Sequence, residues 1–225
     1  MQESSIAKLL FLRRLWPSLR INGEKMAKLY FKYGTVGSAK TLHLLTVAHN
    51  YTLQNKKAFL LKPAIDTRFG KDIIRSRAGL EKRADLVLKN GFGLLDYDFQ
   101  NPDSILVDEA QFFTKEQVED LRLVSLEKDI PIICYGLRCD FRSYLFEGSK
   151  RLMELADSVE EIKSTCFYCH KKASCNLKYL NGKAVADGPS IELGADEKYH
   201  PACYSCYRKQ IQEAKIKMPE MMETK

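Results

Sequence analysis

Residues 34–41 read GTVGSAKT and come close to the phosphate-binding pattern G-x-x-x-x-G-K-[ST]. In that pattern backbone N–H groups and the lysine hold phosphate oxygens, and the final hydroxyl holds Mg²⁺. Here Ala39 stands where the pattern has its second glycine. Alanine favours the helix that is expected to begin at this point, and Gly37 can supply backbone freedom within the loop. The residues of this loop that are predicted to bind a nucleotide are Gly34, Thr35, Val36, Gly37, Ser38, Ala39, Lys40 and Thr41.

The alternative for this stretch is a tight turn between a strand and a helix that contains Lys-Thr by chance. A strand before the loop and a helix after it are the context that the nucleotide-binding motif requires, and both are expected here. We therefore expect Ala39 to alter the affinity for ATP more than the type of reaction.

A second stretch, residues 105–113 with the sequence ILVDEAQFF, delivers two acids at the end of an apolar run. In a parallel sheet the carboxyl ends of the strands face the phosphate loop. We therefore expect Asp108 on the Mg²⁺ side, and Glu109 where it can take a proton from an attacking hydroxyl or water. The alternative is a pair of surface acids that follow a strand. Nucleotide contacts are predicted for Asp108, Glu109, Ala110 and Gln111.

Four of the seven cysteines form two pairs with the spacing C-x-x-C, and these are Cys166, Cys169, Cys203 and Cys206. Four thiolates at such spacings can surround one tetrahedral Zn²⁺ and leave no open coordination position, so the zinc is expected to be structural. Beside the pairs lie two second-choice ligands, His170 and His200. Metal-binding and free thiols in a chain without a secretory signal are typical of a reducing compartment, which predicts a cytoplasmic location.

Alternating strands and helices must position these residues. The pattern of apolar residues predicts strands at 29–33, 58–61, 104–107 and 131–137, and helices at 41–54 and 114–128. Thr114 and Gln117 are placed to form a capping box at the start of the second helix. Continuous apolar strands separated by helices predict an α/β fold, with a parallel sheet and helices on both of its faces.

The composition predicts a division of the chain into parts. We expect an α/β nucleotide-binding domain at residues 26–159, a zinc-stapled module at 160–210 and a polar, fraying tail at 211–225. After Ala156 short alternating runs are expected to replace helices. Residues 1–25 are basic and amphipathic, which fits either a transit peptide or an overcalled start with the true initiator at Met26.

The net charge of +7 comes from 36 basic and 29 acidic residues that are scattered along the chain. This mild excess suits a polyanionic small ligand such as a nucleotide. It gives little support to nucleic-acid binding, which needs a concentrated basic face. The sequence has no apolar run approaching the roughly eighteen residues of a membrane span, so none is predicted.

Taken in order, these motifs resemble the type II, cytosolic-type thymidine kinases over residues 26–209. The motifs are 34-GTVGSAKT-41, 66-DTRFG-70, 108-DEAQFF-113, 135-YGLRCDFR-142, the two cysteine pairs and 194-GADEKYHPAC-203. The resemblance implies a P-loop, RecA-like α/β domain followed by a zinc-ribbon-like lasso domain. It also implies ATP-dependent phosphorylation of the 5′-hydroxyl of thymidine, and of deoxyuridine, to give dTMP for pyrimidine salvage and DNA synthesis. A homotetramer and feedback inhibition by dTTP are further implications.

The same resemblance implies roles for single residues. Glu109 corresponds to the general base, and Arg68 to a residue that lies against the phosphates and stabilises charge during transfer. Phe141 corresponds to a residue that packs on the thymine ring, and Asn176 to one near the thymine methyl. Backbone groups of the lasso segment 190–194 would hold the base edge. The full set of implied nucleoside contacts is Phe112, Leu137, Phe141, Asn176, Ser190, Ile191, Glu192, Leu193, Gly194 and Tyr199.

Two other functions remain open on the sequence. A P-loop ATPase that acts on nucleic acid could use the zinc module as a binding arm, but this would require a basic surface interleaved with aromatic residues. An inactive nucleotide-binding regulator is conceivable because of Ala39, and it would bind nucleotide without turnover.

Overall fold

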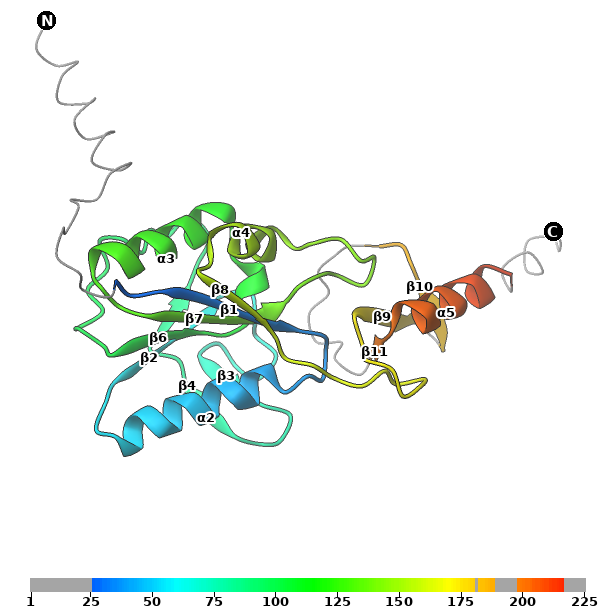
Figure 1. Ribbon diagram of the computed structural model, residues 1–225, viewed down its shortest axis with the longest axis horizontal. Coiled ribbons are helices and arrows are strands. Elements are labelled where there is room, and N and C mark those ends of the chain that lie inside the picture. Colours follow the sequence, from blue (N-terminus) through cyan, green and yellow to red (C-terminus); the bar gives the residue numbers. More distant parts are fainter. Residues whose placement is uncertain (1–25, 181, 189–197, 217–225) are drawn as a thin grey trace, which may run out of the picture.

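The computed structural model describes residues 26–180, 182–188 and 198–216 (Figure 1). Three predictions fall wholly or partly outside the described residues. These are the N-terminal extension 1–25, the base-contacting residues 190–194 and the end of the tail, 217–225.

A six-stranded sheet forms the centre of the larger domain, with the strand order β5-β2-β6-β7-β1-β8. All of its neighbouring strands are parallel, which confirms the predicted sheet. The strands are β1 (Leu29–Gly34), β2 (Ala58–Pro63), β5 (Leu86–Leu88), β6 (Ser104–Val107), β7 (Ile132–Leu137) and β8 (Ser158–Glu161). Because β6 and β1 flank β7, the phosphate loop and the two acids emerge at the same edge of the sheet.

Helices cover both faces of the sheet, as predicted. Figure 1 shows α2 (Lys40–Leu53) on one face, and α3 (Lys115–Glu127) and α4 (Glu147–Leu155) on the other. Successive residues of β6 serve the two layers, because side chains alternate along a strand. Ile105 and Val107 pack in the buried cluster that includes Leu121 of α3, whereas Leu106 packs in the cluster that includes Leu44 of α2.

The predicted capping box is present at the start of α3. The Thr114 hydroxyl accepts a hydrogen bond from the backbone N–H of Gln117 at 3.3 Å. In return, the Gln117 side-chain oxygen accepts one from the backbone N–H of Thr114 at 3.1 Å. Two backbone donors of the first helical turn are therefore satisfied, which fixes the chain as it leaves the acid-bearing segment.

Several short elements were not predicted. The antiparallel hairpin of β3 (Ile73–Arg75) and β4 (Glu81–Arg83) follows β2, and the 3₁₀ turn η1 (Ala110–Phe112) follows the acids. The edge strand β8 reaches Glu161, beyond the expected domain boundary at residue 159. These segments are only three or four residues long, and β4 and β8 carry mostly polar side chains, so their periodicity gives no signal.

The smaller module consists of an antiparallel sheet and a helix. The sheet has the order β10-β9-β11, and its strands are β9 (Cys175–Leu180), β10 (Lys183–Val185) and β11 (Tyr199–Ala202). The helix α5 (Tyr204–Ile216) corrects the expectation that helices end after Ala156, and it continues past residue 211, where the tail was expected to begin. Tyr207 and Ile211 tie α5 to the buried cluster of the module, although the helix is otherwise mostly polar.

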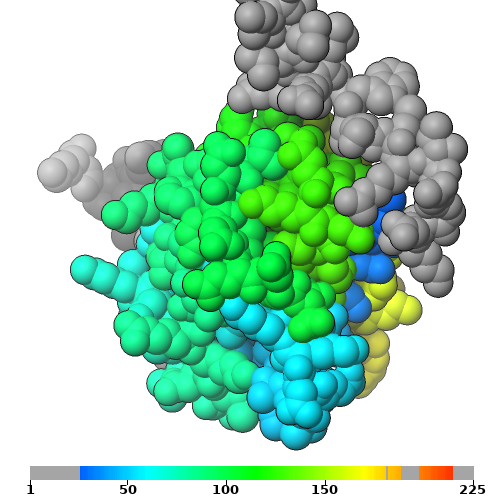
Figure 2. Space-filling view, turned by 90° about the vertical axis from the view of Figure 1, so that its left-hand side faces the viewer, coloured from blue at the N-terminus to red at the C-terminus, as the bar shows by residue number. Residues whose placement is uncertain are grey.

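This module lies at the end of the larger domain where β1 and β7 finish (Figure 1). Seen from the opposite end, the surface is formed mainly by the α/β domain, with α2 in cyan and the segments near α3 in green (Figure 2). Among the described residues, no helix has the length and apolar character needed to cross a membrane.

Candidate active site

The phosphate loop joins β1 to α2 in a tight turn, and its residues contact one another closely. A methyl group at Gly34 would lie 2.3 Å from the Ser38 hydroxyl oxygen and 2.6 Å from a backbone oxygen, so only glycine fits there. Lys40 turns back over the loop, where its ammonium donates to the Thr35 carbonyl oxygen at 2.7 Å. Burial lowers the pKa of Lys40 to about 8, against the opposing effect of the neighbouring carboxylates.

Ala39 has a left-handed backbone, with φ 61° and ψ 26°, and caps α2 without being part of it. The prediction that alanine favours the helix at this position is therefore wrong, because the helical backbone begins only at Lys40. Gly37 is also left-handed, with φ 71°, and supplies the backbone freedom predicted for it. Glycine adopts this conformation freely, but for alanine it costs about 1–2 kcal/mol.

Asp108 and Thr41 meet where the sequence predicts a magnesium site. The Thr41 hydroxyl lies 3.2 Å from both carboxylate oxygens of Asp108. Burial, together with the carboxylates of Glu109 and Asp66, raises the pKa of Asp108 to about 7. The neighbouring carboxylates of Glu109 and Asp66 add negative charge beside Asp108, although burial is the larger cause of its raised pKa.

Glu109 is held in place from two sides. Arg68 donates to one of its carboxylate oxygens, and the side-chain amide of Gln111 donates to the other. The Gln111 oxygen in turn accepts the backbone N–H of Leu137 at 2.9 Å. Glu109 itself has a left-handed backbone, with φ 50°, a conformation that costs energy and persists only where the surroundings enforce it.

Two residues of the site were missed by sequence reasoning. The Asp66 carboxylate accepts a hydrogen bond from Nε of Arg68 at 2.7 Å, and this bond orients the guanidinium toward Glu109. Lys62 is a fully buried residue of β2. Its Nζ lies 3.3 Å from a carboxylate oxygen of Asp66 and donates a hydrogen bond to the backbone oxygen of Ile73 at 2.8 Å. A lysine within an apolar strand, four residues before an aspartate, is the signal that could have identified this pair.

A cavity of about 300 Å³ opens between the phosphate loop and the smaller module. Most of the predicted residues line it: Val36, Gly37, Ser38, Ala39, Lys40, Thr41, Arg68, Glu109, Gln111, Phe112, Leu137, Phe141, Asn176 and Tyr199. The described lining does not include Gly34, Thr35, Asp108 or Ala110. It does include the hairpin residues Arg75, Ser76 and Arg77, which were not predicted because their positions depend on the fold of the β3–β4 connection.

Phe141 and Tyr199 bring aromatic rings to the lining of the cavity. Phe141 is buried, and its ring centroid lies 6.4 Å from that of Tyr199. The Lys178 ammonium lies 4.8 Å from the Phe141 ring centroid, and the Tyr207 hydroxyl donates to the Phe141 carbonyl oxygen at 2.8 Å. The smaller module thus fixes both the ring and the backbone of Phe141, and charged and aromatic side chains line the same cavity.

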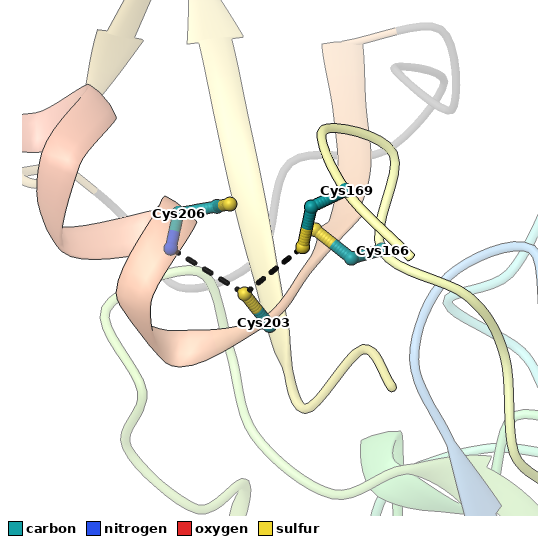
Figure 3. A group of neighbouring side chains, drawn as sticks. All are labelled: Cys166, Cys169, Cys203 and Cys206. Carbon is teal, nitrogen blue, oxygen red and sulfur yellow. Dashed lines mark hydrogen bonds between the residues drawn. The ribbon is translucent and has the colours of Figure 1, made fainter. Parts of the chain in front are cut away.

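The four paired cysteines come together as predicted (Figure 3). Their sulfur atoms all lie within 4.8 Å of one another, and the pairs come from the segment before β9 and from the start of α5. Such a set of four thiolates fits a closed, structural zinc ion. Neither of the second-choice histidines belongs to this group in the described part of the chain; the His200 ring instead pairs with the Tyr168 hydroxyl at 2.8 Å.

Comparison with known proteins agrees with this geometry. A family model described as thymidine kinase matches residues 27–207. A thymidine kinase of Enterococcus faecalis is 43% identical over 184 residues, which is 81% of this chain and 95% of that protein. One from Streptococcus gordonii is 44% identical over 187 residues, 82% of this chain and 97% of its own. One from Streptococcus pyogenes serotype M3 is 43% identical over 185 residues, 81% and 97% of the two chains.

Proposed function

The chain belongs to the thymidine kinase family, and from this premise we propose how its residues transfer the terminal phosphoryl group of ATP to the 5′-hydroxyl of thymidine. The observation that supports the proposal most strongly is the cavity itself. Its lining combines the charged side chains of Lys40, Glu109 and Arg68 with the aromatic rings of Phe141 and Tyr199. A nucleoside seated on the aromatic rings would present its sugar hydroxyl to the charged side chains.

The phosphate loop and Lys40 would bind the phosphates of ATP. Thr41 and Asp108 would hold Mg²⁺, because a hydroxyl and a carboxylate are the hard oxygen ligands that this ion prefers, and the two side chains lie within hydrogen-bond distance of each other. When bound, the ion neutralises charge on the phosphate oxygens. The chain itself adds the Lys40 ammonium and the Arg68 guanidinium to the lining of the cavity.

Glu109 would act as the general base. Its carboxylate takes the proton of the thymidine 5′-hydroxyl as that oxygen bonds to the γ-phosphorus and the bond from this phosphorus to the β,γ-bridging oxygen breaks, which gives dTMP and ADP. The hydrogen bond from Gln111 keeps the carboxylate oriented. Arg68 donates to Glu109 and lines the same cavity as the phosphate loop, so it could stabilise charge on the group in transit.

Phe141 would stack on thymine, and Phe112, Leu137 and Tyr199 would enclose the base. The lasso residues 190–194 would supply backbone contacts to the base edge. A zinc ion held by the four cysteines would keep the module in place as a lid that excludes water from the transfer.

Further parts of this proposal follow from the family resemblance. They are a division into domains at residues 26–159 and 160–210, a homotetrameric assembly, feedback inhibition by dTTP, phosphorylation of deoxyuridine and a cytoplasmic location for pyrimidine salvage.

One assay tests the proposed function. The protein is incubated with ATP, Mg²⁺ and each nucleoside in turn, and nucleoside monophosphate is measured. We expect dTMP from thymidine, and a loss of about 10²–10⁴-fold in rate for Glu109→Gln, because an amide cannot accept the proton. ATP hydrolysis stimulated by DNA, or nucleotide binding without any product, would support the two rival functions instead. A Glu109→Gln variant that keeps more than about half of the activity would exclude Glu109 as the base.

A further inference from the structure

Asn176 makes two hydrogen bonds inside the protein, and they lead to two different parts of the active site. It lies on β9 opposite Pro201 of β11, and its side chain is almost fully buried. Its Oδ1 accepts the backbone N–H of Val36 at 2.9 Å, and its Nδ2 donates to the backbone oxygen of Cys139 at 2.9 Å. An N–H can pair only with the amide oxygen and a carbonyl only with the amide nitrogen, so both bonds require the same orientation of the side chain.

The first of these bonds reaches the middle of the phosphate loop. Val36 precedes Gly37 and Ala39, the two loop residues with a left-handed backbone. Asn176 therefore holds the loop directly before its strained segment. A second bond fastens the neighbouring loop residue to the same region, because the hydroxyls of Thr35 and Ser164 lie 2.6 Å apart. Two successive loop residues are therefore fastened to residues distant in the sequence.

The second bond of Asn176 reaches the segment that carries Phe141. Cys139 follows the end of β7 and comes two residues before Phe141, which lines the cavity. The same segment is held by Arg138, which donates to the Ser174 carbonyl oxygen at 3.3 Å. One amide thus connects the phosphate loop, the segment that carries Phe141 and the smaller module.

We propose that Asn176 is a positioning residue that holds the phosphate loop in its ATP-binding shape, and thereby makes ATP binding depend on the seating of the smaller module. The proposal rests on the proposed function, since it assigns ATP to the loop. It goes beyond the implied contact of Asn176 with the thymine methyl, because that contact gives no reason for an effect on ATP.

Steady-state kinetics of three proteins test this role. Asn176→Leu keeps the approximate size of the side chain but leaves the Val36 N–H and the Cys139 carbonyl without partners. We expect its KM for ATP, measured at saturating thymidine, to rise about tenfold, and its KM for thymidine at saturating ATP to rise less, because the lost Cys139 bond loosens only the backbone before Phe141. Asn176→Asp keeps an acceptor for Val36 but turns an oxygen toward the Cys139 carbonyl, so its KM for ATP should rise less than that of Asn176→Leu. The same change at an exposed asparagine of α2, Asn50→Leu, should alter neither constant.

Deuterium exchange of peptides that cover residues 34–41 supplies a readout apart from activity. Exchange should be faster in Asn176→Leu than in wild type and Asn50→Leu, because the loop has lost a fastening bond. Where the leucine variant does not yield folded protein, Asn176→Ser repeats both measurements without burying an apolar group.

Three results would overturn the proposal. The first is an unchanged KM for ATP together with a raised KM for thymidine, which would leave Asn176 as a contact of the base alone. The second is an equal rise of the KM for ATP in Asn176→Leu and Asn176→Asp, which would mean that the Val36 bond is not the cause. The third is unchanged loop exchange in a folded variant. A wild-type protein that makes no dTMP would count against the proposed function instead, and deuterium exchange would still decide the role of Asn176.

Discussion

Replacing Ala39 by glycine removes one methyl group from a left-handed position in the phosphate loop. The φ of 61° is a conformation that glycine adopts freely and that costs an L-residue about 1–2 kcal/mol. Against this gain, glycine gives the unfolded chain more freedom, which costs about 0.4–1 kcal/mol. The net expectation for Ala39→Gly is a protein more stable by about 0.5–1 kcal/mol, equivalent to a rise of roughly 1–4 °C in Tm for a chain of this size.

A matched control comes from the helix that follows Ala39. Ala48 of α2 is buried, and its backbone is helical. The same chemical change, Ala48→Gly, should destabilise the protein by about 1 kcal/mol from helix propensity alone, with a further loss from the buried methyl. Thermal unfolding of wild type and the two variants, measured in one buffer, should therefore place Ala39→Gly above wild type and Ala48→Gly below it.

The kinetic consequence of Ala39→Gly should be confined to ATP. Because Ala39 lines the cavity as part of the phosphate loop, the KM for ATP should fall by up to about fivefold or stay the same, and the KM for thymidine should not change. A loss of stability as large as that of Ala48→Gly would refute the left-handed assignment of Ala39. An inert wild type that gains thymidine phosphorylation on Ala39→Gly would refute the proposed function, because the chain would then be a regulator whose loop the alanine has closed.

Three further predictions concern the metal site, the buried lysine and the acid pair. Cys166→Ser should lose zinc, whose binding contributes on the order of 10 kcal/mol in small metal modules, while the α/β domain stays folded on its own core; metal analysis that still finds full zinc occupancy would contradict the four-cysteine assignment. Lys62→Met should destabilise the protein by about 1–3 kcal/mol, because the buried Asp66 carboxylate loses one cationic partner while Arg68 remains, and denaturant unfolding beside the exposed control Lys56→Met measures this loss. Asp108 has a pKa of about 7 in the folded protein, above its value in the unfolded chain, so the folded protein binds this proton as the pH falls through 7 and becomes more stable. Without added Mg²⁺, the free energy of unfolding of wild type should therefore rise relative to that of Asp108→Asn between pH 8 and pH 6. Free energies of unfolding that change in parallel for the two proteins would contradict the assignment.

The parts of the fold that the sequence predicts are those with long, regular patterns. The apolar runs of β1, β2, β6 and β7 and the capped helix α3 lie where they were expected. The edge strands β5 and β8 were missed because they are short and only partly buried, and α5 was missed because few apolar residues hold it to the module. The spacing of apolar residues along the sequence does not predict an element whose stability comes mainly from tertiary contacts.

Within the candidate site, motif spacing identified the loop, the acid pair and the cysteines, but it did not identify the residues that hold them. Lys62 and the fastening bonds of Asn176 depend on which backbone groups the fold brings near, and that information is not local. The error at Ala39 has the same origin. A helix propensity was applied to a residue whose φ is set by the turn that precedes the helix.

The left-handed backbones of Ala39 and Glu109 belong to one structural arrangement. Ala39 follows β1 and Glu109 follows β6, the two strands on either side of β7, so both strained residues lie at the same edge of the sheet. Strain of this kind persists only where surrounding contacts leave no relaxed alternative. Gln111 supplies such a contact for Glu109, and Asn176 and Ser164 supply contacts for the loop before Ala39. Asn176 lies on β9 and Ser164 comes shortly before Cys166, so the smaller module and the segment leading into it help to hold the loop that carries the strained alanine.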